Sequence, residues 1–454
     1  MNELFWNQIV AFDFDNPPAE YSFTLRLSKE NNWTKNFTLE AILEYKKFMY
    51  LAATSNRMVS PSKIVDIVWH QHLIFTQSYH SFCQILGKNV QHIPSTHDKK
   101  YFQKFQEAAS RTKHLYTQTF GKQPKAFWTH DDMYGSLNLR KSKVSLSSFI
   151  FWGVLAVLVF ILPFRVLMEP IYLSIDGPNF IWCFIITSVC TFGFLEMYNQ
   201  RALKNILKIA DKDAFIHQLM PSEAIYLKTQ NIVKVINGFV SKLIGLGAIH
   251  IDFDYKMKLN HKSHDNSQEQ TQIVNVLEDL GETHYPSLWP ILATKPVFAN
   301  TAQAMDELKE YVINSTRFRG VFYINFALLS LLTMLGAGRL ITGLYAEKPV
   351  RFLVVLGAIV VYFSVMYLYR LCRLIFTSTV SNYYKKMLTQ QPSKEQRASW
   401  KWDYFLRGDV ALDTAFVSIA GYIDKNSNGG TACGTSCGSS CGGGCGGGCG
   451  GCGG

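Results

Sequence analysis

The sequence predicts a mainly α-helical protein with four transmembrane helices in two pairs and with helical regions before, between and after them. Charged residues make up only 17% of the 454 residues and hydrophobic residues 48%, a balance that indicates apolar segments beyond ordinary cores. Four runs also lack any charged residue, and each has roughly the 17 to 25 residues with which a helix crosses about 30 Å of hydrocarbon. These runs are residues 144–164, 177–195, 320–338 and 352–369.

Membrane spans are therefore expected at 144–166, 177–196, 320–343 and 350–372, and the neighbouring charges predict their orientation. Arg140, Lys141 and Lys143 precede the first span, whereas the loop 167–176 has two acidic residues and no lysine or arginine. The positive-inside rule puts this loop outside and residues 1–140 in the cytoplasm. The second pair of spans favours the same orientation, because the side predicted to be cytoplasmic has more basic residues than the loop between the two spans. The cytoplasmic side has Arg317, Arg319, Arg370, Arg373, Lys385 and Lys386, whereas the loop side has Arg339, Lys348 and Arg351.

Both termini are accordingly predicted to be cytoplasmic. The first residues lack a basic start followed by an apolar stretch, so we expect no cleavable signal peptide. The net charge of +11 follows largely from the residues that flank the spans, which suit contact with anionic lipid. A nucleic-acid-binding protein needs a concentrated basic face, and the sequence shows none. The expected partners are the lipid bilayer and other proteins, not nucleic acid.

Residues 1–140 are expected to form a helical cytoplasmic domain. One helix is indicated by apolar residues at near-helical intervals, namely Leu39, Ile42, Leu43, Phe48 and Leu51. A second helix is predicted to begin at Ser60 and Pro61 and to end at Gly87, because these residue types suit the two ends of a helix. Residues 21–29 alternate briefly, which fits a short strand or the start of a helix.

Residues 197–319 are expected to form a second cytoplasmic domain. The pattern predicts a helix, a second helix that ends at Gly247, and two alternating strands that meet near Asp254 and Tyr255. This order is the outline of a winged-helix-like α+β unit, which can serve protein contacts. An amphipathic helix over 302–313 should lead into the third span. Residues 373–428 are expected to be a C-terminal cytoplasmic segment.

A cluster of histidines lies in "VDIVWHQHL", where Asp66 stands one helical turn before His70. Such a carboxylate can orient an imidazole that binds a metal ion. His70 and His72 point about 200° apart on a regular helix, so they share an ion only if the helix is kinked. His92, beyond the turn at Gly87, could instead fold back towards His70. Alternatively, the histidines satisfy buried polar partners, and His72 shares a stripe with residues 76 to 83.

Residues 429–454 form a glycine-rich tail that is predicted to be disordered, because nothing in it offers apolar area to offset the entropy of ordering glycine. Its cysteines are Cys433, Cys437, Cys441, Cys445, Cys449 and Cys452. In a reducing cytoplasm such thiols can bind soft metals, zinc or copper(I). Alternatively, an enzyme could modify them, or the repeat could be a tolerated product of replication slippage.

Several stretches in order resemble uncharacterised bacterial membrane proteins related to glycine-rich domain-containing proteins. They include "FTLRLSKENNW", "SPSKIVDIVWHQHLIFTQSYHSFC" with its Trp-His-x-His core, "LMPSEAIYLK" and "GAGRLITGLYAEKPVRFLVVL". The resemblance covers most of residues 20–425 and implies the membrane architecture, the bacterial inner membrane and a low-complexity C-terminus. Relatives are expected to have a paired histidine and two glycines near His92, where this chain has "VQHIPSTHDKK". The resemblance implies no particular activity.

Outside the glycine-rich tail, the sequence contains no GxSxG, HExxH, P-loop or dinucleotide-binding motif. The first hypothesis is therefore a non-enzymatic, membrane-anchored scaffold with a thiol-rich tail that could bind metal. The second is a membrane-bound substrate of peptide modification, whose tail is processed. The third is a metal-dependent enzyme that uses the histidine cluster. A transporter is disfavoured, because the four apolar runs lack acidic and basic groups and show no repeat.

Overall fold

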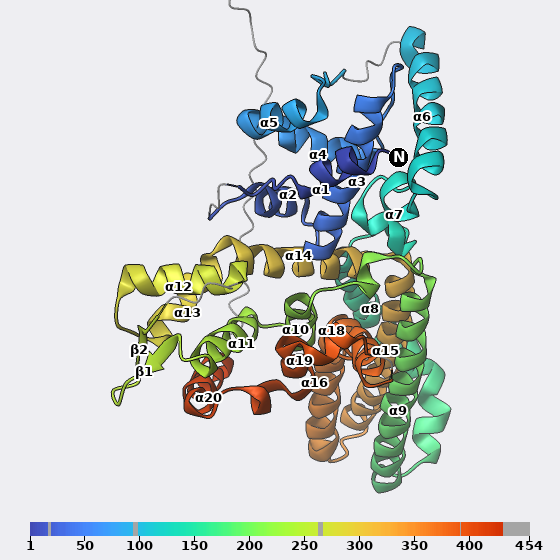
Figure 1. The fold of residues 1–454 in the computed structure, drawn as a ribbon. Coiled ribbons are helices and arrows are strands. Elements are labelled where there is room, and N and C mark those ends of the chain that lie inside the picture. Colours follow the sequence, from blue (N-terminus) through green and yellow to red (C-terminus); the bar gives the residue numbers. More distant parts are fainter. Residues whose placement is uncertain (17–19, 94–98, 262–266, 391, 430–454) are drawn as a thin grey trace, which may run out of the picture.

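The computed structural model describes residues 1–16, 20–93, 99–261, 267–390 and 392–429, which form a mainly helical protein with one small sheet. The N-terminal region lies at one end of a bundle of long helices, and a middle region lies beside it (Figure 1). The cysteines predicted to form a disordered tail lie outside the described residues.

Short helices build the N-terminal region. They are α1 (Glu3–Ala11), α2 (Phe23–Asn31), α3 (Lys35–Thr54), α4 (Lys63–Ile74), α5 (Thr76–Leu86), α6 (Lys99–Phe120), α7 (Lys125–Trp128) and the 3-10 turn η1 (Met133–Leu137). The helical alternative for residues 21–29 is confirmed by α2. The single helix expected from Ser60 to Gly87 is wrong, because Phe75 leaves the helical conformation with φ −87° and ψ 65°. Its ring packs against Phe23 at 5.5 Å, and Ser62 rather than Ser60 caps α4.

Four helices are long and apolar enough to cross a membrane. They are α8 (Leu146–Ser174), α9 (Gly177–Ile209), α15 (Thr316–Tyr345), and α16 (Arg351–Leu374), which continues through the π-helical turn η3 (Ile375–Val380) into α17 (Ser381–Gln390). The predicted spans fall within these helices or at their ends. The predicted loop 167–176 is largely wrong, since α8 continues to Ser174 even though Pro163 and Pro170 lie inside it.

Helix α8 lies at the edge of the bundle, against α15 (Figure 1). Most of its apolar side chains are exposed, among them Phe151, Trp152 and Leu158. A contiguous apolar surface of this kind needs a cover other than water. By its length and composition, this helix could cross a membrane.

The middle region contains helices and a three-stranded sheet. Its elements are η2 (Phe215–His217), α10 (Pro221–Thr229), α11 (Ile232–Gly245), β1 (Ile249–Ile251), β2 (Lys256–Leu259), α12 (Gln268–Leu280), β3 (Thr283–His284), α13 (Tyr285–Thr294) and α14 (Pro296–Ile313). The strands pair antiparallel in the order β1-β2-β3, with Ile249 opposite Leu259. The predicted hairpin near Asp254 and the helix over 302–313 are confirmed.

The C-terminal segment completes the middle region. It consists of α18 (Lys394–Ala398), α19 (Trp400–Arg407), η4 (Gly408–Ala411) and α20 (Thr414–Gly429). Tyr404 of α19 packs on Gly238 of α11, where a Cβ atom would lie 2.7 Å from the tyrosine ring. Glycine therefore permits this close approach.

One continuous apolar core runs through the N-terminal region, the middle region and the adjoining ends of the membrane helices. Helix α14 crosses between the first two regions (Figure 1), and Asn300 on it donates a hydrogen bond to the carbonyl oxygen of Leu25 at 2.8 Å. The segments that lead into α8 and α15 also pair, through an antiparallel bridge between Lys141 and Ser315. Together these contacts join both helix pairs to the regions outside the bundle.

Candidate metal site in the N-terminal region

Helix α4 presents the first two residues of the candidate site. Ser62 accepts a hydrogen bond from the amide of Val65 at 3.2 Å and so caps the start of the helix. Asp66 and His70 are four residues apart, which puts both on one face of α4. The carboxylate oxygen Oδ2 of Asp66 lies 3.5 Å from Nδ1 of His70.

His92 reaches this face from the segment that follows α5. The chain turns at Gly87, whose φ of 64° favours glycine. The Tyr79 hydroxyl then donates a hydrogen bond to the carbonyl oxygen of Val90 and accepts one from the indole nitrogen of Trp69. The Trp69 ring also contacts the His92 ring edge to face, at 4.5 Å between centroids. These aromatic contacts fix the position of His92.

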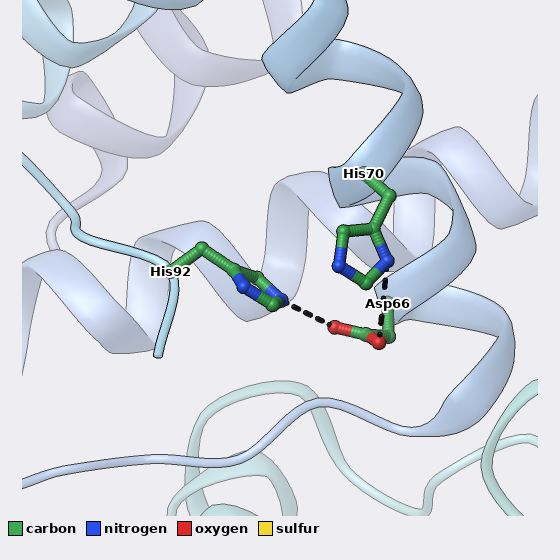
Figure 2. Close-up of side chains that lie close together, drawn as sticks. All are labelled: Asp66, His70 and His92. Carbon is green, nitrogen blue, oxygen red and sulfur yellow. Dashed lines mark hydrogen bonds and ion pairs between the residues drawn. The ribbon is translucent and has the colours of Figure 1, made fainter. Parts of the chain in front are cut away.

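Asp66, His70 and His92 thus meet in one group (Figure 2). Nε2 of His92 lies 2.9 Å from Oδ1 of Asp66, and the two imidazole rings are 4.3 Å apart. One donor atom from each residue lies within 4.8 Å of the other two. The His70 side chain is 55% exposed and that of His92 13% exposed, so the group is open to solvent on one side only.

The donor set suits a transition metal ion. Two imidazole nitrogens and one carboxylate oxygen are typical ligands of zinc, and three protein ligands leave a coordination position open. Ligands about 2.0 to 2.1 Å from a tetrahedral zinc ion are roughly 3.4 Å from one another. The spacings of 2.9 and 3.5 Å end on different oxygen atoms of Asp66, so the side chains would rotate to bring one oxygen and both imidazoles onto a single ion.

His72, the remaining histidine of the predicted set, lies apart from this group. It is completely buried, with Nδ1 2.9 Å from the Tyr45 hydroxyl and Nε2 3.1 Å from the Ser78 hydroxyl. Burial lowers the pKa of His72 to about 3. It therefore fits the alternative of a histidine that satisfies buried polar partners. The predicted thiol ligands, from Cys433 to Cys452, lie outside the described residues.

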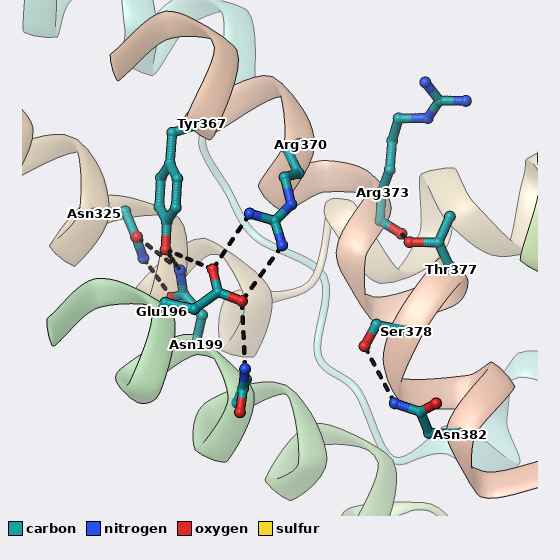
Figure 3. A network of polar contacts seen from close by, with 10 residues as sticks. Glu196, Asn199, Asn325, Tyr367, Arg370, Arg373, Thr377, Ser378 and Asn382 are labelled. Carbon is teal, nitrogen blue, oxygen red and sulfur yellow. Dashed lines mark hydrogen bonds and ion pairs between the residues drawn. The ribbon is translucent and has the colours of Figure 1, made fainter. Parts of the chain in front are cut away.

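A second polar group joins three of the long apolar helices and was missed by the sequence reasoning (Figure 3). The amides of Asn199 and Asn325 bond each other at 2.7 and 2.9 Å, and Asn199 also donates to the Tyr367 hydroxyl at 3.0 Å. Glu196 accepts hydrogen bonds from Tyr367 and Arg370. Because both asparagines are completely buried, these bonds tie α9, α15 and α16 together. Asparagine carries no charge, so a search for charged residues in apolar runs does not find it.

The fold and the site together define a helical protein with four potential membrane helices and a histidine–carboxylate group outside them. Two comparisons with known proteins found a match, each over a small part of the chain. Residues 20–121 match a family described as UCP032817-like. Over 105 residues the chain is 28% identical to glycine-rich domain-containing protein 1 of Arabidopsis thaliana. No solved structure matches this chain.

The alignment with the plant protein covers 22% of this chain and 13% of the relative, so the chain spans only a small part of that protein's length. The resemblance to glycine-rich domain-containing proteins is therefore confirmed over a small part of the chain. The matched residues 20–121 include Asp66, His70 and His92. The bacterial origin and the membrane relatives stay predictions.

Proposed function

We propose that this chain is an integral membrane protein whose N-terminal region binds a divalent transition metal ion through Asp66, His70 and His92. The observation that carries the proposal is the convergence of two imidazoles and one carboxylate from two separate segments of the chain. Zinc is the ion that this mixture of nitrogen and oxygen donors suits best. The ion would join the segment around His92 to α4.

The proposed role of the metal is to hold a binding surface in place, in a membrane-anchored scaffold that recruits partners. Three protein ligands leave a position at which a partner or small molecule can bind the ion directly. A metal-dependent enzyme is the second candidate, since an open position also allows activation of water. The solvent-exposed side of the group is compatible with both the scaffold and the enzyme. The scaffold is proposed first because it requires no catalytic side chain in addition to the metal ligands.

The proposed setting is the inner membrane of a bacterium, with both termini in the cytoplasm. The basic residues Arg140, Lys141 and Lys143 before the first span support this orientation. Single cysteines placed at Lys113 and at Lys348 of a cysteine-free variant test the orientation. Only the cysteine at 348 should react with an impermeant maleimide in intact cells.

We further propose that the middle region is a winged-helix-like unit for protein contacts. We also propose that the cysteine tail binds zinc or copper(I) or is a substrate for modification.

Cobalt binding to the full-length protein in detergent tests the metal site. Metal-free protein is titrated with Co²⁺, whose visible absorption reports coordination by nitrogen and oxygen ligands. His70→Ala and His92→Ala are each expected to weaken binding at least about tenfold, because a ligand is lost. His80→Ala is the matched control, since His80 is an exposed histidine on α5 that contacts only Gln84 among the interactions described. Equal affinity of His92→Ala and the unmodified protein would refute the proposal.

The tail is tested in the same titration. Thiolate ligands give cobalt charge-transfer bands that a nitrogen and oxygen site lacks, so binding to the tail is recognised by its spectrum. A variant that ends at residue 430 should lose those bands and keep the absorption of the histidine site. Intact mass of the tail in the unmodified protein then separates metal binding from covalent modification.

A further inference from the structure

A cavity of about 580 Å³ lies beside the candidate metal site. The end of α3, the chain between α3 and α4, the first turns of α4 and the segment around His92 line it. Asp66 and His92 belong to its lining and His70 does not. A metal ion bound by the three residues would therefore stand at the edge of the cavity, accessible to a molecule inside.

The described lining has a net positive charge, and Lys63 also forms an ion pair with Asp131 at 3.5 Å. Arg57, Lys63 and Lys88 line the cavity, and Asp66 is the one acidic residue among the described residues of the lining. Lys88 donates hydrogen bonds to the carbonyl oxygens of Ala52 and Ser55 at 3.0 and 3.1 Å, which fix its ammonium group at the wall. Within the described part of the chain, neither Arg57 nor Lys88 forms an ion pair. A metal ion would neutralise Asp66 and add further positive charge.

The inner wall of the cavity is apolar. Phe48, Trp69 and Val90 contribute to the lining, and all three are at least nine-tenths buried. A cavity of this size is within the range of about 300 to 1,000 Å³ typical of small-molecule sites. It is larger than a simple inorganic anion requires. An occupant with both an anionic group and an apolar group matches the two kinds of wall.

We infer that this cavity binds a small organic phosphate, with its phosphate group near Arg57, Lys63 and the metal ion, and its apolar group against Trp69. A phosphate monoester carries close to two negative charges at neutral pH, which suits several cations better than the single charge of a carboxylate. Arginine and lysine are also the side chains that bind phosphate oxygens through charge-assisted hydrogen bonds. This inference rests on the proposed function, since the ion is one of the phosphate ligands.

Phenyl phosphate is the probe for this site. Full-length protein in detergent, loaded with Co²⁺, is titrated with phenyl phosphate, inorganic phosphate and benzoate, and both heat and cobalt absorption are recorded. Phenyl phosphate should change the cobalt spectrum and bind at least about tenfold more tightly than benzoate, because it has the larger charge. It should also bind more tightly than inorganic phosphate, which has no apolar group.

The double variant Arg57→Gln/Lys63→Gln tests the cationic wall. Both side chains are exposed, so the fold should be retained, and cobalt affinity should not change. Phenyl phosphate should bind about tenfold or more weakly, because two charged donors are lost. Lys113→Gln, an exposed lysine on α6 outside the lining, is the control and should leave binding unchanged.

Two results separate the inference from the proposed function. Cobalt binding without any response to phenyl phosphate, or with equal affinity for benzoate, would overturn the organic phosphate and leave the metal site intact. Absence of cobalt binding would overturn both. If the double variant binds phenyl phosphate as tightly as the unmodified protein does, the assignment of the ligand to this cavity is also overturned.

Discussion

Nε2 of His92 lies 2.9 Å from Oδ1 of Asp66, although 26 positions separate the two residues in the chain. The other oxygen of the same carboxylate lies 3.5 Å from Nδ1 of His70. A single aspartate therefore holds both imidazoles. This shared carboxylate makes Asp66 the residue on which the geometry of the candidate site depends most.

Asp66→Asn is predicted to weaken cobalt binding at least about tenfold, since the amide removes the anionic ligand and one acceptor for the two histidines. The side chain keeps its size, so α4 should remain folded. The measurement is the cobalt titration together with the far-ultraviolet circular dichroism of the same sample. Retained affinity in a folded Asp66→Asn protein would show that the carboxylate is only a hydrogen-bond partner of the histidines.

His72 is predicted to make the protein less stable in acid. The ordinary pKa of histidine is 6.5, and burial lowers that of His72 to about 3. Between these pH values the unfolded chain binds a proton that the folded protein does not. The free energy of unfolding should therefore fall as the pH is lowered from 6.5 towards 3, by about 1.4 kcal/mol per pH unit from this group.

His72→Gln is the variant that isolates this effect, because glutamine can bond Tyr45 or Ser78 but does not titrate. Chemical unfolding of the full-length protein in detergent, followed over that pH range, gives the slope. The variant should be less stable at pH 7, since one buried hydrogen bond is lost. Its free energy of unfolding should also fall less as the pH is lowered from 7 towards 3. A pH slope equal to that of the unmodified protein would contradict the prediction.

Glu223 is predicted to have the opposite effect. It is completely buried, accepts hydrogen bonds from the amides of Lys35 and Met220, and its pKa is raised by burial to about 7 from 4.5. Between pH 4.5 and 7 the folded protein holds a proton that the unfolded chain has lost. Its contribution to stability should therefore decrease as the pH rises through this window, again by about 1.4 kcal/mol per unit.

The two groups oppose each other between pH 4.5 and 6.5, so the unmodified protein should show a shallow pH dependence there. Glu223→Gln removes one of them and should reveal a loss of stability on acidification. Exposed Glu310→Gln serves as the control for loss of a carboxylate. A pH profile of Glu223→Gln that overlies that of the unmodified protein would rule out the buried carboxyl group as the cause.

Arg339 is predicted to hold the end of α8 in place. Its guanidinium donates hydrogen bonds to the carbonyl oxygens of Tyr172 and Ile175, and the Tyr172 hydroxyl donates to the carbonyl oxygen of Leu335 at 2.9 Å. Arg339→Met keeps the length of the side chain but leaves the carbonyl groups at the end of α8 without this donor. We expect a loss of about 1.5 to 3 kcal/mol.

Thermal unfolding in detergent measures this change. Arg317→Met, which removes an exposed arginine from the same helix, is the control and should change stability much less. Equal melting temperatures of Arg339→Met and Arg317→Met would show that the helix end is held by apolar packing alone. In that case substitution of Gly338 should lower the stability more than substitution of Arg339, because a Cβ atom at position 338 would lie 2.7 Å from the Tyr172 hydroxyl.

Local patterns predicted the elements of this fold better than their contacts. The length of each charge-free run was sufficient to predict four helices that are long and apolar enough to cross a membrane, because such a helix depends on a continuous stretch of chain. The break at Phe75 was missed because the Phe75 ring packs against Phe23, more than 50 positions earlier, and no local pattern indicates that contact. The reciprocal bonds between Asn199 and Asn325 span 126 positions, and no local pattern in either segment indicates them.

The candidate site was predictable in part for the same reason. Asp66 and His70 lie on one face of a helix by their spacing alone. The approach of His92 was one of several alternatives, since the path of the chain after Gly87 depends on the contacts of Tyr79 and Trp69 with the segment around Val90. The cationic cavity was not predicted, because Arg57, Lys63 and Lys88 come from three different elements.

The bridge between Lys141 and Ser315 has a consequence for how the protein is made. Ser142 donates a backbone hydrogen bond to Asn314, and Thr316 donates one to Arg140, both at 2.8 Å. A ribosome completes the first helix pair long before it synthesises Ser315. The backbone groups of Arg140 and Ser142 therefore stay without these partners until residues 314–316 have been synthesised.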